Sequence, residues 1–545
     1  MLLLLLVSLS VIVGPSFQLP SSAQWNSLNT TVQGRLLRGI PFARPCYELV
    51  SDVEGQADAQ ECSSIIQGYS STALRANNFG AYMNTQWETC QVNSSQCLLN
   101  SASPSDTGAF MPPRVCHQGS VPDYGIDVRS AEDAITGFNF SRAHGVRLVI
   151  KNTGHDFMGR SSAPGALALW VNMDMHNLQS ITSEGEFVPA GCTAAKQTQK
   201  VPAVTYGAGV SFQALIDFAE ANNFTIPTAG DASVAGGGGY VQGGGHSVLS
   251  NSLGLAVDRA PPHQLQFEVV TPTGKHVNAS ECHYSDLFFA LRGGGGGTFG
   301  AVLSVTTLAL PKMSINAVQV DIKSNRDDQR RLIHFMAAHA LQFAQAGWGG
   351  FTLPLTVVIF ANPVLNATRA NETIEPLRKF TQELGGNFTF VVEPSYKSFF
   401  DNFGANVPVG TQLAVSSRLI PVGNFKTPQA IETLANAIDE TLDQVSLPIL
   451  FASTPFLYGI KGRTSVTPKW RSSLWHVAFT EGWSFNTSVS DAATMYKRLS
   501  TAANTLRNIT AGSGAYLNEA DIYEPDFEDS FWGDNYNELV AIKNK

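Results

Sequence analysis

The chain has 545 residues, too many for one ordinary domain, since domains usually contain about 100–200 residues. Hydrophobic residues make up 43% of it and charged residues only 14%, which excludes an intrinsically disordered protein. The net charge is −9 and the basic residues are scattered, which argues against a nucleic-acid partner, because such a partner calls for a basic patch or stripe. We therefore expect a globular protein of two or three compact units.

An apolar run from Met1 to Gly14 is too short to span a bilayer but is typical of a signal peptide core. Small residues at Ser21 and Ala23 predict cleavage after Ala23, and no other apolar stretch approaches the length of a membrane span. We expect a secreted protein. Export is also favoured by N-x-[Ser/Thr] sequons, which predict glycosylation at Asn29, Asn93, Asn139, Asn223, Asn278, Asn366, Asn371, Asn387, Asn486 and Asn508.

Five of the seven cysteines lie in residues 24–118, a turn-rich N-terminal extension with little periodicity. None has the C-x-x-C spacing of a zinc site, so disulfides are the expected use in an exported chain. Proximity along the chain suggests the pairs Cys46 with Cys62 and Cys90 with Cys97. The odd count leaves at least one thiol unpaired.

The first clear elements are a strand that ends at Val128 and a capping box, Ser130-Ala-Glu-Asp133, that starts a helix. Gly145 is expected to end this helix before the strand Val146–Ile150. A loop, Lys151-Asn-Thr-Gly-His-Asp-Phe-Met-Gly-Arg160, follows.

A second strand-helix-strand pattern covers 201–226, with Ser211 as the helix cap, and leads into the glycine-rich loop Gly230–Ser247. A hairpin over 265–277, a helix Asp286–Leu291, the five-glycine run Gly293–Gly297 and a strand Phe299–Leu310 come next. After Pro311 the composition changes to long helical stretches, at 327–346 and 427–444, and β-rich segments such as 351–360.

Glycine in such numbers indicates backbone that takes positive φ or lets another group approach closely. A single loop of this kind would most simply be a flexible linker. Three of them beside strand ends favour convergence on a ligand, since backbone N–H groups can bind a pyrophosphate. The sequence Gly295-Gly-Gly-Thr-Phe-Gly300 has the form G-x-G-x-x-G, but it follows a helix and precedes a strand, which excludes a Rossmann fingerprint.

Other catalytic motifs are missing from the sequence. There is no P-loop, no G-x-S-x-G and no H-E-x-x-H. His155-Asp156 could be half of a metal site, but the next histidine is His176 and no ligand cluster surrounds them at the right spacing, so no metal is expected.

Four motifs together resemble the berberine bridge enzyme-like FAD-linked oxidases, which are vanillyl-alcohol oxidase (VAO) type flavoproteins. These motifs are Asn152-Thr-Gly-His155-Asp, GGYVQGGGHS at Gly238–Ser247, DLFFALRGGGGGTFG at Asp286–Gly300, and Tyr516-Leu-Asn518 with FWGDNY at Phe531–Tyr536. The resemblance implies an α+β fold: a PCMH-type (VAO-like) FAD-binding domain of two subdomains and a substrate domain made of an antiparallel sheet and helices. It divides the chain into a signal peptide (1–23), the N-terminal extension (24–118), the FAD domain (119–311), the substrate domain (312–512) and a C-terminal segment (513–545).

The resemblance implies that FAD is attached covalently to His155 through the flavin 8α-methyl carbon. A neutral imidazole with a pKa near its usual value of about 6.5 is a competent nucleophile. The alternative is that His155 is only a loop histidine whose ring is hydrogen-bonded to backbone. The same resemblance implies further FAD contacts in the first two loops, at Lys151, Asn152, Thr153, Gly154, Asp156, Gly230, Asp231, Gly236, Gly238, Gly239, Gly243 and Gly244.

Many relatives attach the flavin a second time through a cysteine, and the position that matches it here is Ala232. We therefore expect a single covalent bond. Tyr516 matches a tail tyrosine that acts as base in some relatives, with Asn518 beside it, but a phenol with a pKa near 10 would need a nearby cation or hydrogen bonds. The alternative for Tyr516 is packing against the flavin. Tyr240 matches a flavin-contacting position, or is a core residue at a strand edge.

The implied reaction is hydride transfer from a small-molecule substrate to FAD, with O2 as the acceptor that reoxidises it. The aromatic-rich second domain favours oxidation or oxidative cyclisation of a small hydrophobic metabolite. The alternative is a carbohydrate or simple alcohol oxidase that releases hydrogen peroxide. A third possibility is a secreted flavin-bearing binding protein without turnover.

Overall fold

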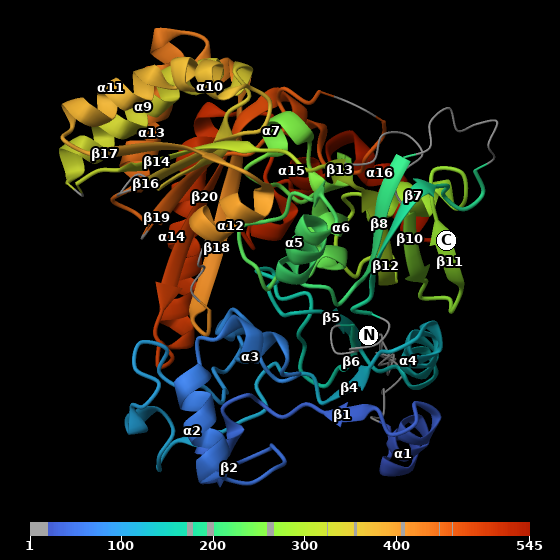
Figure 1. The fold of residues 1–545 in the computed structure, drawn as a ribbon. Coiled ribbons are helices and arrows are strands. Elements are labelled where there is room, and N and C mark those ends of the chain that lie inside the picture. Colours follow the sequence, from blue (N-terminus) through green and yellow to red (C-terminus); the bar gives the residue numbers. More distant parts are fainter. Residues whose placement is uncertain are drawn as a thin grey trace, which may run out of the picture.

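The computed structural model describes residues 20–171, 178–192, 201–258, 266–323, 325–353, 357–404, 409–445, 447–459 and 462–545. Apart from residues 20–23, the expected signal peptide lies outside this part of the chain. Three large sheets with helices packed on them make up the fold (Figure 1). Among the described helices, none is both long and apolar enough to cross a membrane.

The first sheet has four strands in the order β1-β4-β6-β5. Three are parallel, β4 (Tyr124–Asp127), β6 (Leu167–Trp170) and β5 (Leu148–Lys151), and β1 (Leu36–Arg38) from the N-terminal extension pairs antiparallel with β4. Helix α4 (Ala131–His144) joins β4 to β5. Its predicted signals are confirmed, since Ser130 and Asp133 form the capping box and Gly145 ends the helix at φ 64°.

The second sheet has five antiparallel strands in the order β11-β10-β12-β8-β7. The predicted hairpin is confirmed as β10 and β11, and Ser211 caps α5 as expected. The strand after α5 pairs outside this sheet, with the segment that follows β12, so the second strand-helix-strand pattern divides its strands between two sheets. The elements are β7 (Ile181–Phe187), β8 (Val201–Gly207), α5 (Phe212–Ala221), β9 (Phe224–Thr225), β10 (Gln266–Val270), β11 (His276–Ala279), α8 (Ser285–Leu291), β12 (Ala301–Leu308) and β13 (Leu310–Pro311).

The glycine-rich segment expected as a loop contains short helical turns. They are a π-helical turn, η4 (Gly236–Tyr240), and α6 (Val241–Gly243), and α7 (Ser250–Leu253) follows the segment. The π-helical turn has non-helical backbone at Gly238. Glycine lacks the side chain that would crowd such tight backbone. A glycine run that resembles a flexible linker in sequence can therefore form helical turns here.

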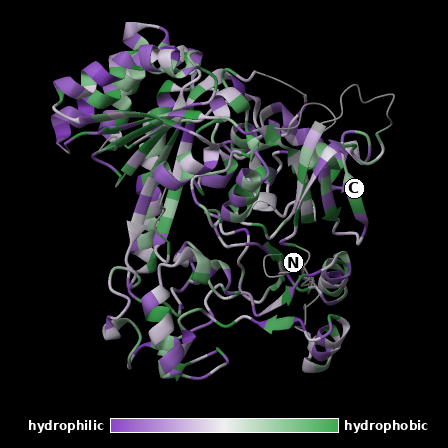
Figure 2. Cartoon of the chain, viewed as in Figure 1, coloured by the Kyte–Doolittle hydropathy of each residue, from purple (hydrophilic) through white to green (hydrophobic). Residues whose placement is uncertain are grey.

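The third sheet has seven antiparallel strands in the order β17-β14-β16-β15-β19-β20-β18. The helices predicted at 327–346 and 427–444 are confirmed as α9 and α13, and their apolar faces enclose the largest core of the molecule. Figure 1 shows these two helices with α10 and α11 gathered over one side of the sheet. In Figure 2 the strands below them are mostly hydrophobic, whereas the outer helices carry hydrophilic segments. The strands are β14 (Ile315–Asp321), β15 (Gly349–Leu353), β16 (Val357–Asn362), β17 (Asn387–Glu393), β18 (Gln412–Pro421), β19 (Leu447–Ala452) and β20 (Ser473–Trp483), and the helices are α9 (Arg326–Gln345), α10 (Ala367–Thr373), α11 (Glu375–Glu383), α12 (Tyr396–Phe403), α13 (Pro428–Thr441) and α14 (Val489–Ile509).

The N-terminal extension is a small cystine-stabilised unit. It contains α2 (Ala59–Gly68), α3 (Thr72–Ala76) and a parallel pair of short strands, β2 (Leu49–Val50) and β3 (Val115–Cys116), whereas α1 (Ser22–Thr31) packs on α4. The predicted Cys46–Cys62 disulfide is confirmed, and Cys192 bonds to Cys282 outside this unit.

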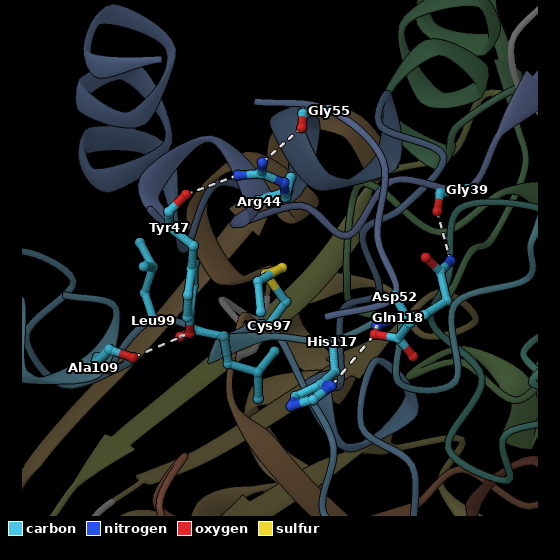
Figure 3. The surroundings of a disulfide bond; sticks show 12 residues. Gly39, Arg44, Tyr47, Asp52, Gly55, Cys97, Leu99, Ala109, His117 and Gln118 are labelled. Carbon is cyan, nitrogen blue, oxygen red and sulfur yellow. Dashed lines mark hydrogen bonds and ion pairs between the residues drawn. A yellow bond between two sulfur atoms is a disulfide. The ribbon is translucent and has the colours of Figure 1, made fainter. Parts of the chain in front are cut away.

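The predicted Cys90–Cys97 pair is wrong. Cys97 bonds to Cys116 and Cys90 is a free thiol. The intervening chain turns back, so that β3 brings Cys116 to Cys97, and proximity in sequence missed this return. Figure 3 shows the disulfide beside Tyr47, whose hydroxyl donates to the carbonyl of Ala109 at 3.1 Å.

The C-terminal segment packs on the second sheet's side of the molecule. It contains α15 (Phe527–Phe531) and α16 (Tyr536–Lys543), preceded by the short turn η8 (Leu517–Glu519). Helix α16 contacts α8, and Trp532 Nε1 donates to the carbonyl of Gly293 at 3.2 Å. This segment therefore lies against the glycine run that follows α8.

Candidate active site

Three glycine-rich loops meet at one place in the fold. They are the first loop (151–160) after β5, the second loop (230–247) after β9 and the third loop (293–297) after α8. Asn152 lies against Gly238, and a Cβ built on Gly296 would stand 2.7 Å from the Cα of Gly239. A side chain at Gly296 would collide with backbone, so this approach requires glycine. The expected convergence of the loops is confirmed.

Gln242 holds the second and third loops together. Its backbone carbonyl accepts hydrogen bonds from the N–H groups of Gly293 and Gly295, each at 3.0 Å. Its side-chain Nε2 donates to the carbonyls of Gly237 at 3.1 Å and Gly238 at 3.2 Å. The sequence does not reveal this role, because a glutamine inside a glycine run has no signature of its own.

His155 lies in the first loop with its ring held by the second loop. Its Nε2 is 2.7 Å from the Oγ of Ser233, whose hydroxyl donates to Asp231 Oδ1 at 2.7 Å. The Ser233 oxygen therefore accepts from His155, which places the ring proton on Nε2. Burial lowers the pKa of His155, partly opposed by the charge of Asp231, so the imidazole is neutral at neutral pH. Its Nδ1 has no hydrogen-bond partner among the described residues.

A chain of polar contacts joins the first loop to the C-terminal segment. Asp156 accepts from Arg160 Nε at 3.0 Å, and Arg160 in turn donates to Asn518 Oδ1 at 3.0 Å. Asn518 Nδ2 donates to the carbonyl of Gly239 at 3.0 Å and to the hydroxyl oxygen of Tyr516 at 2.8 Å. The structure thus brings Asp156, Gly239, Tyr516 and Asn518 together.

Tyr516 is buried, with 3% of its surface exposed. Its hydroxyl oxygen also accepts from the N–H of Gly245 at 3.2 Å, and its ring packs edge-on against Trp470. Burial raises the pKa of Tyr516 well above its usual value, more than these two N–H groups lower it. The depressed pKa that a tyrosine base would need is therefore not found in the protein itself.

Tyr240 and Lys151 have surroundings that the sequence did not indicate. The Tyr240 hydroxyl donates to the carbonyl of His246 at 3.1 Å. Lys151 is fully buried, with its Nζ 3.5 Å from the carbonyl of Asn78 and 5.0 Å from the centre of the Tyr82 ring. Burial lowers the pKa of Lys151 to about 7. Its amine therefore packs against residues of the N-terminal extension.

The other predicted contacts lie along the first and second loops. Gly154 and Gly244 have positive φ, at 87° and 129°. Thr153 and Gly236 are buried, Gly230 is exposed, and Gly243 lies against the Asn518 side chain.

A cluster of three ionisable side chains adjoins Tyr516. His246 Nε2 lies 3.2 Å from Glu519 Oε1, and His476 Nε2 lies 2.7 Å from Glu519 Oε2. One potential ligand atom from each of the three side chains lies within 4.8 Å of the other two. Among the described residues, these three are the group that could hold a metal ion. Sequence reasoning missed it because the three residues come from the second loop, β20 and η8. Only the position of His246 inside the GGGHS motif could have drawn attention to it.

The residues of this site fit an FAD cofactor in three respects. The loops present backbone free of side chains, as a pyrophosphate or flavin ring requires. The Oδ1 of Asn152 is a buried acceptor without a protein partner, which a ligand donor would satisfy. His155 offers the unprotonated Nδ1 described above.

Comparison with known proteins identifies two families. The FAD binding domain family matches residues 122–280, and the berberine and berberine like family matches residues 515–545. An FAD-linked oxidoreductase of Aspergillus flavipes is 32% identical over 98% of this chain and 92% of its own length. Another from Chaetomium globosum is 33% identical over 96% of this chain and 84% of its own length.

A solved structure shares the fold. The VAO-type flavoprotein MtVAO615 from Myceliophthora thermophila C1 is similar, with a TM-score of 0.83 and 26% identity over 98% of this chain and 94% of that chain. The expected fold class, cofactor and enzyme class are therefore confirmed: an α+β, PCMH-type fold, FAD, and an oxidoreductase. The chain belongs to the berberine bridge enzyme-like FAD-linked oxidoreductases of the vanillyl-alcohol oxidase type.

Proposed function

We propose that this oxidoreductase is a secreted oxidase that carries its FAD on His155 and oxidises a small organic metabolite, with O2 as electron acceptor. One observation carries the covalent attachment: Ser233 and Asp231 hold the His155 ring by Nε2 and leave Nδ1 unprotonated and unpaired. When bound, FAD supplies a hydride acceptor and an electrophilic methyl carbon. His155 Nδ1 is the proposed attachment atom.

A single attachment is proposed because the second loop offers no other nucleophile at the expected place. Ala232 stands where many relatives have a cysteine. The one free thiol among the described cysteines, Cys90, belongs to the N-terminal extension. Peptide mapping should find flavin only on the peptide that contains His155. A second flavin-bearing peptide would overturn the single bond.

The FAD contacts proposed around this bond come from the first and second loops. Asn152, Thr153, Gly154 and Asp156 come from the first loop. The second loop supplies Gly230, Asp231, Gly236, Gly238, Gly239, Gly243 and Gly244. Lys151 is proposed to contribute through its backbone alone, because its amine is bonded to the carbonyl of Asn78.

A small hydrophobic substrate is proposed because aromatic side chains surround the polar groups beside Tyr516. The rings of Phe451 and Trp470 lie 5.2 and 6.1 Å from that of His246. Leu255, Val257 and Val466 complete an apolar cluster around Tyr516. Apolar surroundings of this kind favour a planar apolar molecule over a hydrated sugar. Within these surroundings, Tyr516 and Asn518 are proposed to bind the reacting oxygen of the substrate, and Tyr240 to support the loop.

Secretion is proposed from the disulfides and the sequons. Three disulfides are present, as in proteins that fold in an oxidising compartment. Nine of the ten sequon asparagines are exposed, and Asn29 is half-buried. Expression with the native leader should give a glycoprotein in the medium, and retention in the cells would contradict secretion.

Acid precipitation of the purified holoenzyme tests the covalent bond. We expect yellow colour to stay in the pellet of the wild type and to move to the supernatant in His155→Ala. The matched control is His283→Ala, a histidine outside the glycine loops. A colourless wild-type pellet would overturn attachment to His155.

Substrate oxidation is tested by adding candidate alcohols and sugars to the holoenzyme. Anaerobic loss of flavin absorbance followed by peroxide release in air would support an oxidase. Faster bleaching by aromatic alcohols than by oligosaccharides is the expected result, and the reverse order would favour a carbohydrate oxidase. A flavin that no compound bleaches would favour a binding protein.

A further inference from the structure

His246 stands at the junction of three segments of the chain. Its ring centre lies 5.3 Å from that of Tyr516 and 5.0 Å from that of His476. Although aromatic rings enclose it, 12% of its side chain stays exposed. An imidazole that is packed yet accessible at one edge can exchange a proton with a bound molecule.

Glu519 fixes the orientation of this ring. One carboxylate oxygen binds His246 Nε2 at 3.2 Å, and the other binds His476 Nε2 at 2.7 Å. Burial raises the pKa of Glu519, but the two imidazoles oppose this and hold it well below its usual range, so the side chain is a carboxylate. A carboxylate bonded to one ring nitrogen fixes the tautomer and leaves the other nitrogen as a base. His246 Nδ1 has no partner among the described residues.

His476 supports Glu519 from the opposite side. It is fully buried, and burial lowers its pKa, so its ring is neutral. The 2.7 Å contact therefore places its proton on Nε2, as donor to Glu519. Its Nδ1 is buried without a partner, which excludes contact with a substrate.

We propose that His246 Nδ1 is the proton acceptor in substrate oxidation, with Glu519 and His476 as positioning residues. This inference depends on the oxidation chemistry proposed above. A substrate O–H or N–H bond breaks and its proton goes to His246 Nδ1. The freed electron pair forms the C=O or C=N bond as the adjacent carbon loses a hydride to FAD, which is reduced by two electrons.

The titratable groups that face His246 leave it as the acceptor. Tyr516 is a buried phenol whose oxygen accepts two N–H groups, so it can donate a hydrogen bond to a substrate oxygen. The Tyr240 hydroxyl is engaged with the backbone of His246 itself. Glu519 and His476 hold each other. His246 Nδ1 is thus the accessible acceptor among them.

The same three side chains offer the donor set of a divalent cation, but their geometry favours a proton network. The 2.7 Å separation between His476 and Glu519 is a direct hydrogen bond. Metal-binding histidines usually donate their other ring N–H to a partner, and neither His246 nor His476 has such a partner among the described residues. Elemental analysis of the holoenzyme should find no stoichiometric Zn²⁺, Cu²⁺ or Mn²⁺. One bound ion per chain, lost in Glu519→Gln, would overturn the proposal.

Nitrogen NMR of 15N-histidine holoenzyme at pH 8 tests the tautomer without any substrate. The signals of His246 are identified by their loss in His246→Gln. We expect Nε2 to be protonated and Nδ1 to be unprotonated, and we expect the two tautomers to mix in Glu519→Gln. Protonation of Nδ1 in the wild type would overturn the proposal. The control is Glu268→Gln, which removes the carboxylate 2.8 Å from His276 on the exposed β10–β11 hairpin and should leave the His246 signals unchanged.

Anaerobic flavin reduction tests the role itself, with coniferyl alcohol and cellobiose as probes. His246→Gln should slow reduction about 100-fold or more and abolish the acidic limb of the pH profile, where protonation of the base stops the reaction. His276→Gln should change neither. Equal rates in His246→Gln and the wild type would overturn the proposal. If neither probe reduces the flavin, the NMR measurement of the His246 tautomer decides between the proposal and its rejection. Flavin retained in acid pellets of His246→Gln separates a failure here from a failure of the His155 attachment.

Discussion

At the scale of single residues, the buried Lys151 shows how burial sets protonation. The fold removes its amine from water and offers one backbone carbonyl and aromatic rings in return. Its pKa falls from 10.5 to about 7, so the folded protein favours the neutral amine. Between pH 7 and pH 10 the unfolded chain holds a proton that the folded protein lacks, and stability therefore rises with pH.

Replacing Lys151 with methionine should remove this cost. Each pKa unit corresponds to about 1.4 kcal/mol, so we expect Lys151→Met to be a few kcal/mol more stable than the wild type at pH 7. The difference should shrink as the pH rises toward 10.5, the pKa of the unfolded lysine, and disappear above it. Thermal unfolding measured across this pH range checks the prediction, with Lys312→Met, a half-exposed lysine, as control. A destabilised Lys151→Met at pH 7 would mean that the carbonyl and ring contacts outweigh desolvation.

At the scale of elements, signals that act within a few residues were read correctly from the sequence. The α4 capping box, the stop at Gly145 and the β10–β11 hairpin each depend on local backbone chemistry. Features that depend on residues far away in the sequence were not predicted. β6 inserts between β4 and β5, and Cys97 pairs across a returning chain.

The residues of the candidate site also divide into those that local motifs mark and those that only the fold brings together. His155, Asn518 and the glycines were found because motifs mark them. Ser233, Gln242 and the partners of His246 were missed, since Glu519 lies 273 residues from His246 in the chain. No single stretch of sequence carries such a contact.

The Gln242 side chain provides a test of loop assembly. Gln242→Ala removes donors to two buried glycine carbonyls, and we expect a loss of about 1–3 kcal/mol of stability. Because these carbonyls shape the second loop, flavin occupancy should fall too, as measured by the ratio of flavin to protein absorbance. Gln213→Ala, which removes an exposed contact with Asp217 on α5, is the matched control. Full occupancy and unchanged unfolding temperature in Gln242→Ala would contradict this role.

At the scale of the whole molecule, disulfides close long loops that packing alone would have to order. Cys192 and Cys282 are separated by 90 residues. Removing this link restores freedom to the unfolded chain, worth about 4–5 kcal/mol in the chain-entropy account.

The double variant Cys192→Ser with Cys282→Ser should therefore unfold at a clearly lower temperature than the wild type. Cys90→Ser, at the free thiol, is the control and should behave as the wild type. Calorimetry under non-reducing conditions makes the comparison. If the double variant is as stable as Cys90→Ser, the disulfide does not stabilise the fold and packing alone does.

The contact between Asn518 and Gly239 has a consequence for the order of events during synthesis. These residues are 279 positions apart, so at about 5–20 residues per second the ribosome makes the second loop tens of seconds before its C-terminal partner. A nascent chain stalled before Tyr516 would present the glycine loops without Asn518, Tyr516 and Trp532 to close them. We therefore expect cofactor loading to be a late, post-translational step, so that a ribosome-bound chain remains colourless.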